Sequence, residues 1–226
     1  MAVNFIIFDL DGTLVDSKLD LAHSVNATRQ HYGLPLLDND LVYSYVGNGA
    51  HVLIRKAIGP DRSEEEVQQA LDYFLAYYRD HMLDNTVLYP GVKESLDRLK
   101  ADGVILSVLT NKPVRFSRDI LAGLGVSGHF MNIYGGNSFE QKKPDPMGVR
   151  VLLAEAGVPK EEALMVGDSA VDVLTARNAE VAVCGVTYGF QPESLAAELP
   201  DILVDSMEQL ADMVVADRRS KGETKP

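Results

Sequence analysis

The chain has 226 residues, of which 46% are hydrophobic and 24% charged, with 33 acidic residues against 21 basic ones. The net charge of −12 disfavours binding to nucleic acid or to an anionic membrane surface, because both partners are themselves negatively charged. A single cysteine, Cys184, excludes an internal disulfide and a multi-cysteine zinc site. The sequence shows neither a signal peptide nor an apolar run approaching the roughly 20 residues of a membrane helix. We therefore expect a cytoplasmic protein, with a monomer as the default and a dimer as the alternative.

Short unbroken apolar runs predict strands that are buried on both faces, as in a parallel sheet. Such runs occur, in chain order, at residues 5–8, 104–109, 163–166, 181–186 and 202–204, with a weaker one at 131–134. Helical patterns separate most of them, at residues 92–99, 113–121, 146–156, 171–175 and from 206 onward. This alternation predicts an α/β fold with a doubly wound, mostly parallel, Rossmann-like sheet covered by helices on both faces.

One long stretch, residues 17–88, interrupts the alternation and contains no convincing strand. Helical patterns recur within it at 21–32, 38–45, 50–58 and 63–82. The last pattern carries an aromatic stripe that we interpret as core packing, formed by Tyr73, Phe74, Tyr77 and Tyr78. An insert of this size is too long for a loop. We therefore predict a small all-helical cap domain over residues 17–88, inserted into a catalytic core of residues 1–16 and 89–226.

Polar side chains follow four of the predicted strands. They are Asp9 and Asp11 after the run at 5–8, Thr110 and Asn111 after 104–109, Lys143 beyond 131–134, and Asp168 and Asp172 after 163–166. The carboxyl ends of parallel strands share one edge of the sheet, where ligands bind, so we expect these groups to meet. Carboxylates gathered without histidine or cysteine are typical of a Mg²⁺ site, because a hard cation offsets their mutual repulsion.

These segments together resemble the signature motifs of the haloacid dehalogenase superfamily. The motifs, in family order, are Asp9-Leu10-Asp11-Gly12-Thr13, Thr110-Asn111-Lys112, Lys143-Pro144 and Gly167-Asp168-Ser169 with Asp172. Within the superfamily the chain most resembles the phosphoglycolate phosphatase group, whose helical cap follows the first strand. The resemblance implies a Mg²⁺-dependent phosphatase that acts on a small phosphorylated metabolite and forms an aspartyl-phosphate intermediate.

The resemblance also implies a role for each motif residue. Asp9 is expected to be the nucleophile and Asp11 the general acid and base. The residues expected to hold the phosphoryl group are Thr110, Asn111 and Lys143. The residues expected to bind or support Mg²⁺ are Asp9, Asp168, Asp172 and, through its backbone carbonyl, Asp11.

Alternative reactions remain open at this point. Pyrophosphate, sugar phosphates and nucleotides are alternative substrates. A mutase similar to β-phosphoglucomutase is less favoured, because such enzymes carry His in the first cap helix and Glu before the fourth-motif Asp, where this chain has Leu21 and Gly167. A phospho-accepting receiver module is least favoured, because it is about half this length and has no cap.

A cap that closes over the site excludes water and contacts the leaving group, and a cap of this size favours a small substrate. We expect 2-phosphoglycolate first. Gly47 and Gly49 allow a cap loop to approach the substrate closely, and Asn48 between them offers an amide. Arg55 offers a guanidinium for a carboxylate. The sequence therefore predicts Asn48 and Arg55 as substrate-binding residues.

Overall fold

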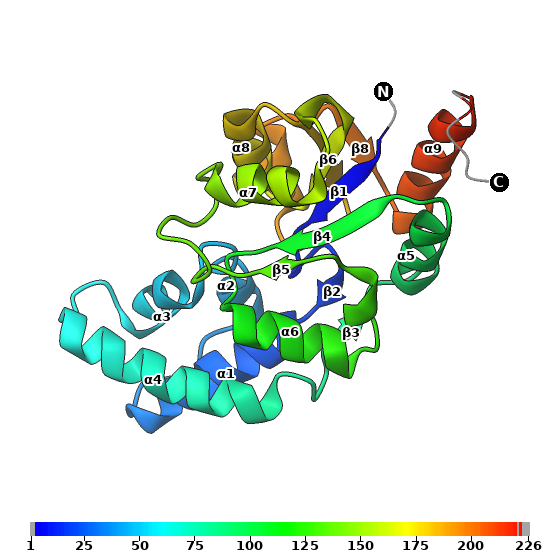
Figure 1. Ribbon diagram of the computed structural model, residues 1–226. Helices are drawn as coiled ribbons and strands as arrows, with labels where there is room; N and C mark the ends of the chain where they lie inside the picture. The colour runs from blue at the N-terminus through cyan, green and yellow to red at the C-terminus, as the bar shows by residue number, and fades with distance from the viewer. Residues whose placement is uncertain (1–2, 221, 223–226) are drawn as a thin grey trace.

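The computed structural model describes residues 3–220 and 222, and its centre is a six-stranded parallel sheet (Figure 1). The strands are β1 (Phe5–Phe8), β4 (Ile105–Leu109), β5 (Ile133–Tyr134), β6 (Ala163–Gly167), β7 (Ala182–Val186) and β8 (Ile202–Val204). Their order in the sheet is β5-β4-β1-β6-β7-β8. The chain builds one side of the sheet from β1 and then returns to add β6 on the other side. This reversal creates a switch point at the carboxyl ends of β1 and β6, which is where open α/β sheets bind ligands.

Helices cover both faces of the sheet, which confirms the predicted doubly wound α/β fold. One face carries α5 (Val92–Ala101), α6 (Val114–Gly123) and α9 (Met207–Ser220), and the other carries α7 (Met147–Ala156) and α8 (Ala170–Ala179). Short 3₁₀ turns lie at Ser127–His129, Lys160–Glu162 and Pro192–Ala196. Side chains of β1 pack on both faces of the sheet. Ile6 and Phe8 pack with α5, α6 and α9, and Phe5 and Ile7 pack with α7 and α8. The unbroken apolar run of β1 therefore reflects burial on two sides.

Four helices form a separate group beside one edge of the core, as Figure 1 shows. They are α1 (Lys18–His31), α2 (Asn39–Tyr43), α3 (Ala50–Ile58) and α4 (Glu64–His81). Helix α4 starts with a capping box, in which the Ser63 hydroxyl accepts from the Glu66 N–H at 3.2 Å and the Glu66 carboxylate accepts from the Ser63 N–H at 2.8 Å. Within residues 3–220 and 222, no helix combines the length and the apolar character that crossing a bilayer requires.

A two-stranded antiparallel ribbon joins this helical group to the core. It pairs β2 (Val15–Asp16) with β3 (Val87–Leu88). The expectation that residues 17–88 hold no strand is therefore wrong at its last two positions. Two residues per strand are too few to produce a periodic pattern in the sequence. The predicted domain boundaries fall at this ribbon, and the division into two domains stays a prediction.

A buried carboxylate ties the start of the helical insert to its end. Asp20, on α1, accepts hydrogen bonds from the backbone N–H groups of Asn85 and Thr86 at 3.0 and 2.8 Å. It also accepts from the Asn85 amide at 2.8 Å and from the Thr86 hydroxyl at 2.7 Å. Burial favours a higher pKa for Asp20, but the hydrogen bonds from Asn85 and Thr86 outweigh it, and the pKa lies below its ordinary value.

We expect Asp20→Asn to lower the free energy of unfolding at pH 7 by about 1–3 kcal/mol, because buried donors lose their acceptor. A carboxyl group whose pKa is depressed on folding stabilises the protein above its unfolded pKa, about 3.9 for aspartate. That contribution is lost as the pH falls through the folded pKa, so the stabilities of wild type and variant should converge in acid. Urea denaturation between pH 3 and 7 measures this, with the exposed Asp84→Asn as the control. A constant difference across that range would contradict it.

Candidate active site

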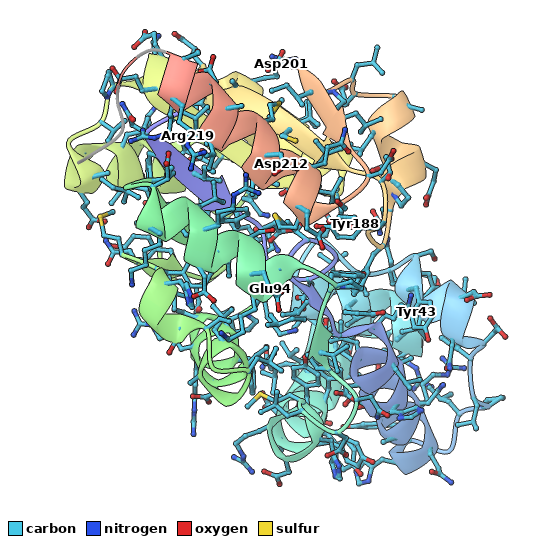
Figure 2. The ribbon with its side chains drawn as sticks, turned by 90° about the vertical axis from the view of Figure 1, so that its right-hand side faces the viewer. Tyr43, Glu94, Tyr188, Asp201, Asp212 and Arg219 are labelled. Atoms are coloured by element: carbon cyan, nitrogen blue, oxygen red, sulfur yellow. The ribbon has the colours of Figure 1, made fainter. Side chains whose placement is uncertain are left out.

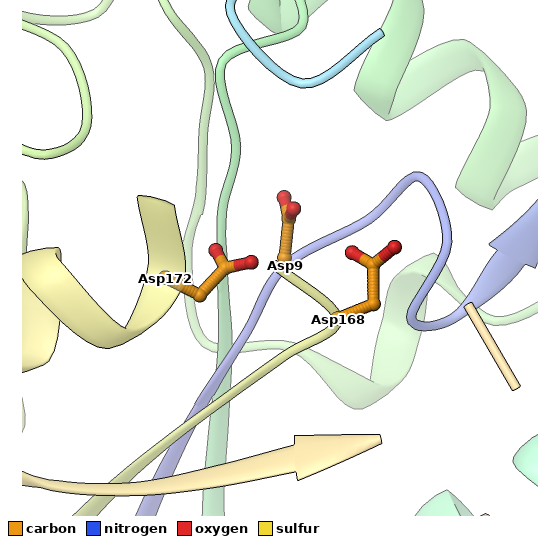
Figure 3. A group of neighbouring side chains, drawn as sticks. All are labelled: Asp9, Asp168 and Asp172. Atoms are coloured by element: carbon orange, nitrogen blue, oxygen red, sulfur yellow. The ribbon is translucent and has the colours of Figure 1, made fainter. Parts of the chain in front are cut away.

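Three aspartates meet at the carboxyl edge of the sheet, and Figure 3 shows their side chains together. Asp9 directly follows β1, Asp168 directly follows β6, and Asp172 lies in the first turn of α8. All three are buried, and one carboxylate oxygen from each lies within 4.8 Å of the others. Strand pairing explains the meeting, because β1 and β6 are neighbours and the Asp9 N–H donates to the Val166 carbonyl at 2.8 Å.

The loop after β1 turns sharply and returns next to Asp168. The Leu14 N–H donates to the Leu10 carbonyl at 2.9 Å, and Gly12 adopts φ 83°. A Cβ atom at Gly12 would lie 2.3 Å from an Asp168 carboxylate oxygen. Glycine is therefore required at this motif position both for its backbone angle and for the close approach. The Tyr188 hydroxyl donates to the Thr13 carbonyl at 3.0 Å, and Figure 2 shows Tyr188 at the end of the core that faces the cap.

Lys143 joins two of the three carboxylates. Its ammonium lies 2.8 Å from an Asp9 oxygen and 2.7 Å from an Asp172 oxygen. The other Asp172 oxygen accepts from the Ser169 hydroxyl at 2.7 Å and from the Ser169 N–H at 3.2 Å. Both oxygens of Asp172 are thus engaged, and this carboxylate fixes the position of Lys143 between α8 and Asp9.

The burial of these carboxylates has an electrostatic consequence. Burial raises the pKa of Asp9 to about 6, with Asp172 adding to the shift and Lys143 opposing it. Burial, followed by repulsion from Asp172 and Asp9, raises the pKa of Asp168 to about 8. Burial acts to lower the pKa of Lys143, but Asp172 and Asp9 outweigh it and the pKa is raised. When ionised, the three carboxylates outnumber the single positive charge of Lys143, and the raised pKa values reflect this unbalanced repulsion together with burial. The all-oxygen donor set fits a hard divalent cation such as Mg²⁺.

The second aspartate of the first motif faces a different partner. The Asp11 carboxylate oxygens lie 3.0 and 3.1 Å from the Lys112 ammonium, and one of them accepts from the Ser17 hydroxyl at 2.5 Å. Lys112 follows β4 in the chain and is buried. It is a site residue that the sequence analysis did not single out, although it belongs to the second motif.

These groups lie at a pocket between the core and the helical insert. Asp9, Asp11 and Asp168 line it together with Thr110, Asn111 and Lys112. The insert supplies an apolar wall that includes Leu21, Leu53, Phe74 and Tyr78. The aromatic stripe predicted to pack in the core does so at Phe74 and Tyr78, which are buried, and both also line the pocket. Tyr73 and Tyr77 are half-buried.

The cap loop, residues 46–49, is held against the core by side chains that donate to its backbone carbonyls. The Asn111 amide donates to Gly47 at 3.0 Å, and the Gln191 amide donates to Val46 at 2.8 Å. Lys142 donates to the third carbonyl, that of Asn48, at 2.6 Å. The Asn111 amide also donates to the Lys143 carbonyl at 3.1 Å. Asn111 therefore connects the cap loop to the segment that carries Lys143.

The two substrate-binding residues expected from the insert lie away from the pocket lining. Gly47 and Gly49 line the pocket, as their spacing predicts, but Asn48 between them is exposed. Arg55 pairs with Glu64 at the surface of the insert. In this arrangement neither side chain is among those that form the pocket, and their roles in binding stay predictions.

Comparison with known proteins places this arrangement in a family. The family model described as haloacid dehalogenase-like hydrolase matches residues 6–186, which include Asp9, Lys143 and Asp172. The chain belongs to the haloacid dehalogenase-like hydrolase family.

Relatives of this hydrolase match over nearly its whole length. A phosphoglycolate phosphatase of Vibrio vulnificus strain CMCP6 is 41% identical over 222 residues, covering 94% of this chain and 96% of the relative. A phosphoglycolate phosphatase 1 of Pseudomonas aeruginosa is 39% identical over 212 residues, covering 91% of this chain and 77% of the relative. The crystal structure of a predicted phosphoglycolate phosphatase from Haemophilus somnus matches with a TM-score of 0.90 and 36% identity, covering 94% of this chain and 98% of that one. The hydrolase is thus a phosphatase, as expected.

Proposed function

We propose that this phosphatase hydrolyses 2-phosphoglycolate, with Asp9 as the nucleophile and Mg²⁺ as the cofactor. The observation that carries the proposal is the placement of Asp9. Its carboxylate lies between Lys143 and the Asp168 side of the acidic cluster, and it opens into a pocket that also contains Asp11. The relatives of about 40% identity carry the name of the same substrate.

The carboxylates suit a divalent cation, as their charge and all-oxygen chemistry indicate. We assign Asp9, Asp168 and the backbone carbonyl of Asp11 to hold Mg²⁺, and Asp172 to support the site by fixing Lys143. A Mg²⁺ ion held there would offset the negative charges of Asp9 and of the phosphate, which would otherwise repel each other.

In the first step, an Asp9 oxygen attacks phosphorus in line with the bond to the leaving oxygen. A bond forms between Asp9 and phosphorus, the bond to the glycolate oxygen breaks, and Asp11 donates a proton to that oxygen. Lys143, 2.8 Å from Asp9, offsets the repulsion between carboxylate and phosphate. Thr110 lines the same pocket and is assigned to hold the phosphoryl group.

In the second step, Asp11 takes a proton from water, and the resulting hydroxide oxygen attacks the same phosphorus. The bond between Asp9 and phosphorus breaks, inorganic phosphate leaves, and both aspartates return to their starting states. Asp11 thus serves as acid and then as base, which requires a fixed position. Lys112 and Ser17 provide it.

Two positions argue against the mutase alternative. Leu21, in the first helix of the insert, lines the pocket and offers no group that transfers a proton. A Cβ atom at Gly167 would lie 2.2 Å from the Asp172 carboxyl carbon, so a glutamate at this position does not fit beside Asp172. Hydrolysis remains the function that the site supports best.

Phosphate release across a substrate panel tests the proposal. The panel contains 2-phosphoglycolate, pyrophosphate, glucose 6-phosphate, glucose 1-phosphate, a nucleoside monophosphate and p-nitrophenyl phosphate. We expect kcat/KM for 2-phosphoglycolate to exceed every other value by about tenfold or more, roughly 1.4 kcal/mol of transition-state discrimination. We expect EDTA to abolish release and added Mg²⁺ to restore it. A preference for another panel member would contradict the proposed substrate, and full activity in EDTA would contradict the cofactor.

A further inference from the structure

A cation and a hydroxyl, those of Lys112 and Tyr78, lie together in the pocket beside Asp11. In the proposed chemistry Lys112 only positions Asp11, and Tyr78 has no role. The Lys112 ammonium lies 4.6 Å from the centre of the Tyr78 ring, on helix α4 of the insert. Both side chains are buried, and both line the pocket. Lys143 neutralises the nucleophile Asp9, whereas Lys112 lies beside Asp11, the residue assigned to protonate the leaving oxygen.

Both groups have hydrogens to donate, but only Lys112 has an acceptor, the carboxylate of Asp11. Among the described residues, the buried Tyr78 hydroxyl has no hydrogen-bond partner that could accept its proton. Lys112 beside it is a donor only. A buried hydroxyl without an acceptor is unfavourable, and a ligand that brings a carboxylate oxygen removes that cost.

The length of the leaving group brings a carboxylate to this position. Asp11 must contact the bridging oxygen of the substrate in order to protonate it. In phosphoglycolate a single methylene carbon separates that oxygen from the carboxylate. The Lys112 ammonium is 3.0 Å from Asp11, so a carboxylate attached through one carbon lies within its reach. Arg55, paired with Glu64 at the surface, is not needed for this contact.

The apolar part of the pocket wall restricts what else can bind. Leu53, Phe74 and Phe116 line the same pocket, and a sugar bound against them would place hydroxyl groups on apolar side chains. Such hydroxyls lose their water without gaining partners. The wall therefore favours a short leaving group whose polar atoms all lie at the end next to Lys112.

We propose that Lys112 and the Tyr78 hydroxyl together bind the carboxylate of the leaving group, and that this pair selects phosphate esters of short hydroxy acids. The inference rests on the proposed function and deepens it. Tyr78 comes from the insert and Lys112 from the core, so the selecting pair is complete only when the insert lies against the core.

Two substrates and two variants test the pair. The substrates are 2-phosphoglycolate and ethyl phosphate, which has a methyl group in place of the carboxylate. Tyr78→Phe keeps the ring over Lys112 and removes only the hydroxyl. We expect it to lower the ratio of kcat/KM values, phosphoglycolate over ethyl phosphate, by about tenfold, the loss of one hydrogen bond to a charged group. Lys112→Met should lower the ratio further and also slow both substrates, because Lys112 positions Asp11. Tyr77→Phe, one residue earlier on α4, is the control.

The outcomes distinguish a failure of the selecting pair from a failure of the proposed substrate, 2-phosphoglycolate. A wild-type protein that prefers phosphoglycolate, with an unchanged ratio in Tyr78→Phe and Lys112→Met, would overturn the inference and leave the proposed substrate standing. A parallel loss on both substrates, again with an unchanged ratio, would reduce the pair to a structural role. A wild-type protein without preference for phosphoglycolate over ethyl phosphate would contradict the proposed substrate itself, and the selecting pair with it.

Discussion

Asp9→Asn is expected to lower kcat for 2-phosphoglycolate by about 10⁴-fold or more, because an amide cannot act as the nucleophile and enzymes that lose theirs retain little activity. The substitution keeps the shape of the side chain, so the fold should persist. It also removes one partner of Lys143, which keeps its contact with Asp172. Steady-state phosphate release at saturating Mg²⁺ measures the loss.

Asp61→Asn is the matched control for this substitution, since Asp61 is exposed on the insert and the charge change is the same. We expect its kcat to equal that of the wild type. Turnover of Asp9→Asn within tenfold of the wild type would remove Asp9 as the nucleophile. The acidic cluster would then serve only to bind the metal.

Asp11→Asn is expected to separate the two chemical steps. With 2-phosphoglycolate, kcat should fall by about 10²- to 10⁴-fold, the usual contribution of a positioned acid and base. With p-nitrophenyl phosphate, whose leaving group departs without protonation, the first step should survive. A rapid burst of about one equivalent of nitrophenolate should then precede slow turnover, because water still needs a base.

Stopped-flow absorbance measures the burst, and Asp16→Asn, at the nearby β2 strand, is the control. Because the Asp11 substitution leaves the buried Lys112 without its anionic partner, thermal unfolding of the variant is recorded in parallel. Equal losses on both substrates with no burst, in a folded variant, would contradict the assignment of Asp11 as acid and base.

The main sheet was predictable because its strands are buried on both faces, and burial on both faces requires consecutive apolar residues in the sequence. The acidic cluster was predictable for a related reason: parallel strands deliver the residues that follow them to one edge. For Asp9 and Asp168 it was enough that each directly follows a strand of the parallel sheet. The short ribbon at Val15–Asp16 and Val87–Leu88 was not predictable, because two-residue strands carry no periodicity.

The side of the site that faces the insert could not be derived in the same way. An aromatic residue on a helix face looks the same in sequence whether it packs in the insert or lines a pocket, and Tyr78 does both. Lys112 is part of the second motif, but its pairing with Asp11 depends on how the loops after β1 and β4 turn. Arg55 pairs with Glu64, nine residues away in sequence. The sequence analysis considered Arg55 only as a cation for the substrate and did not predict this ion pair.

Location of the phosphoryl group by mass spectrometry tests the proposed mechanism most directly. Asp11→Asn is mixed with p-nitrophenyl phosphate and Mg²⁺, quenched in acid at the end of the burst, digested and mapped. We predict one phosphoryl group on the peptide that contains Asp9, carried by the Asp9 side chain and absent when substrate is omitted. A phosphoryl group on any other residue, or a stoichiometric burst that leaves Asp9 unmodified, would contradict covalent catalysis by Asp9.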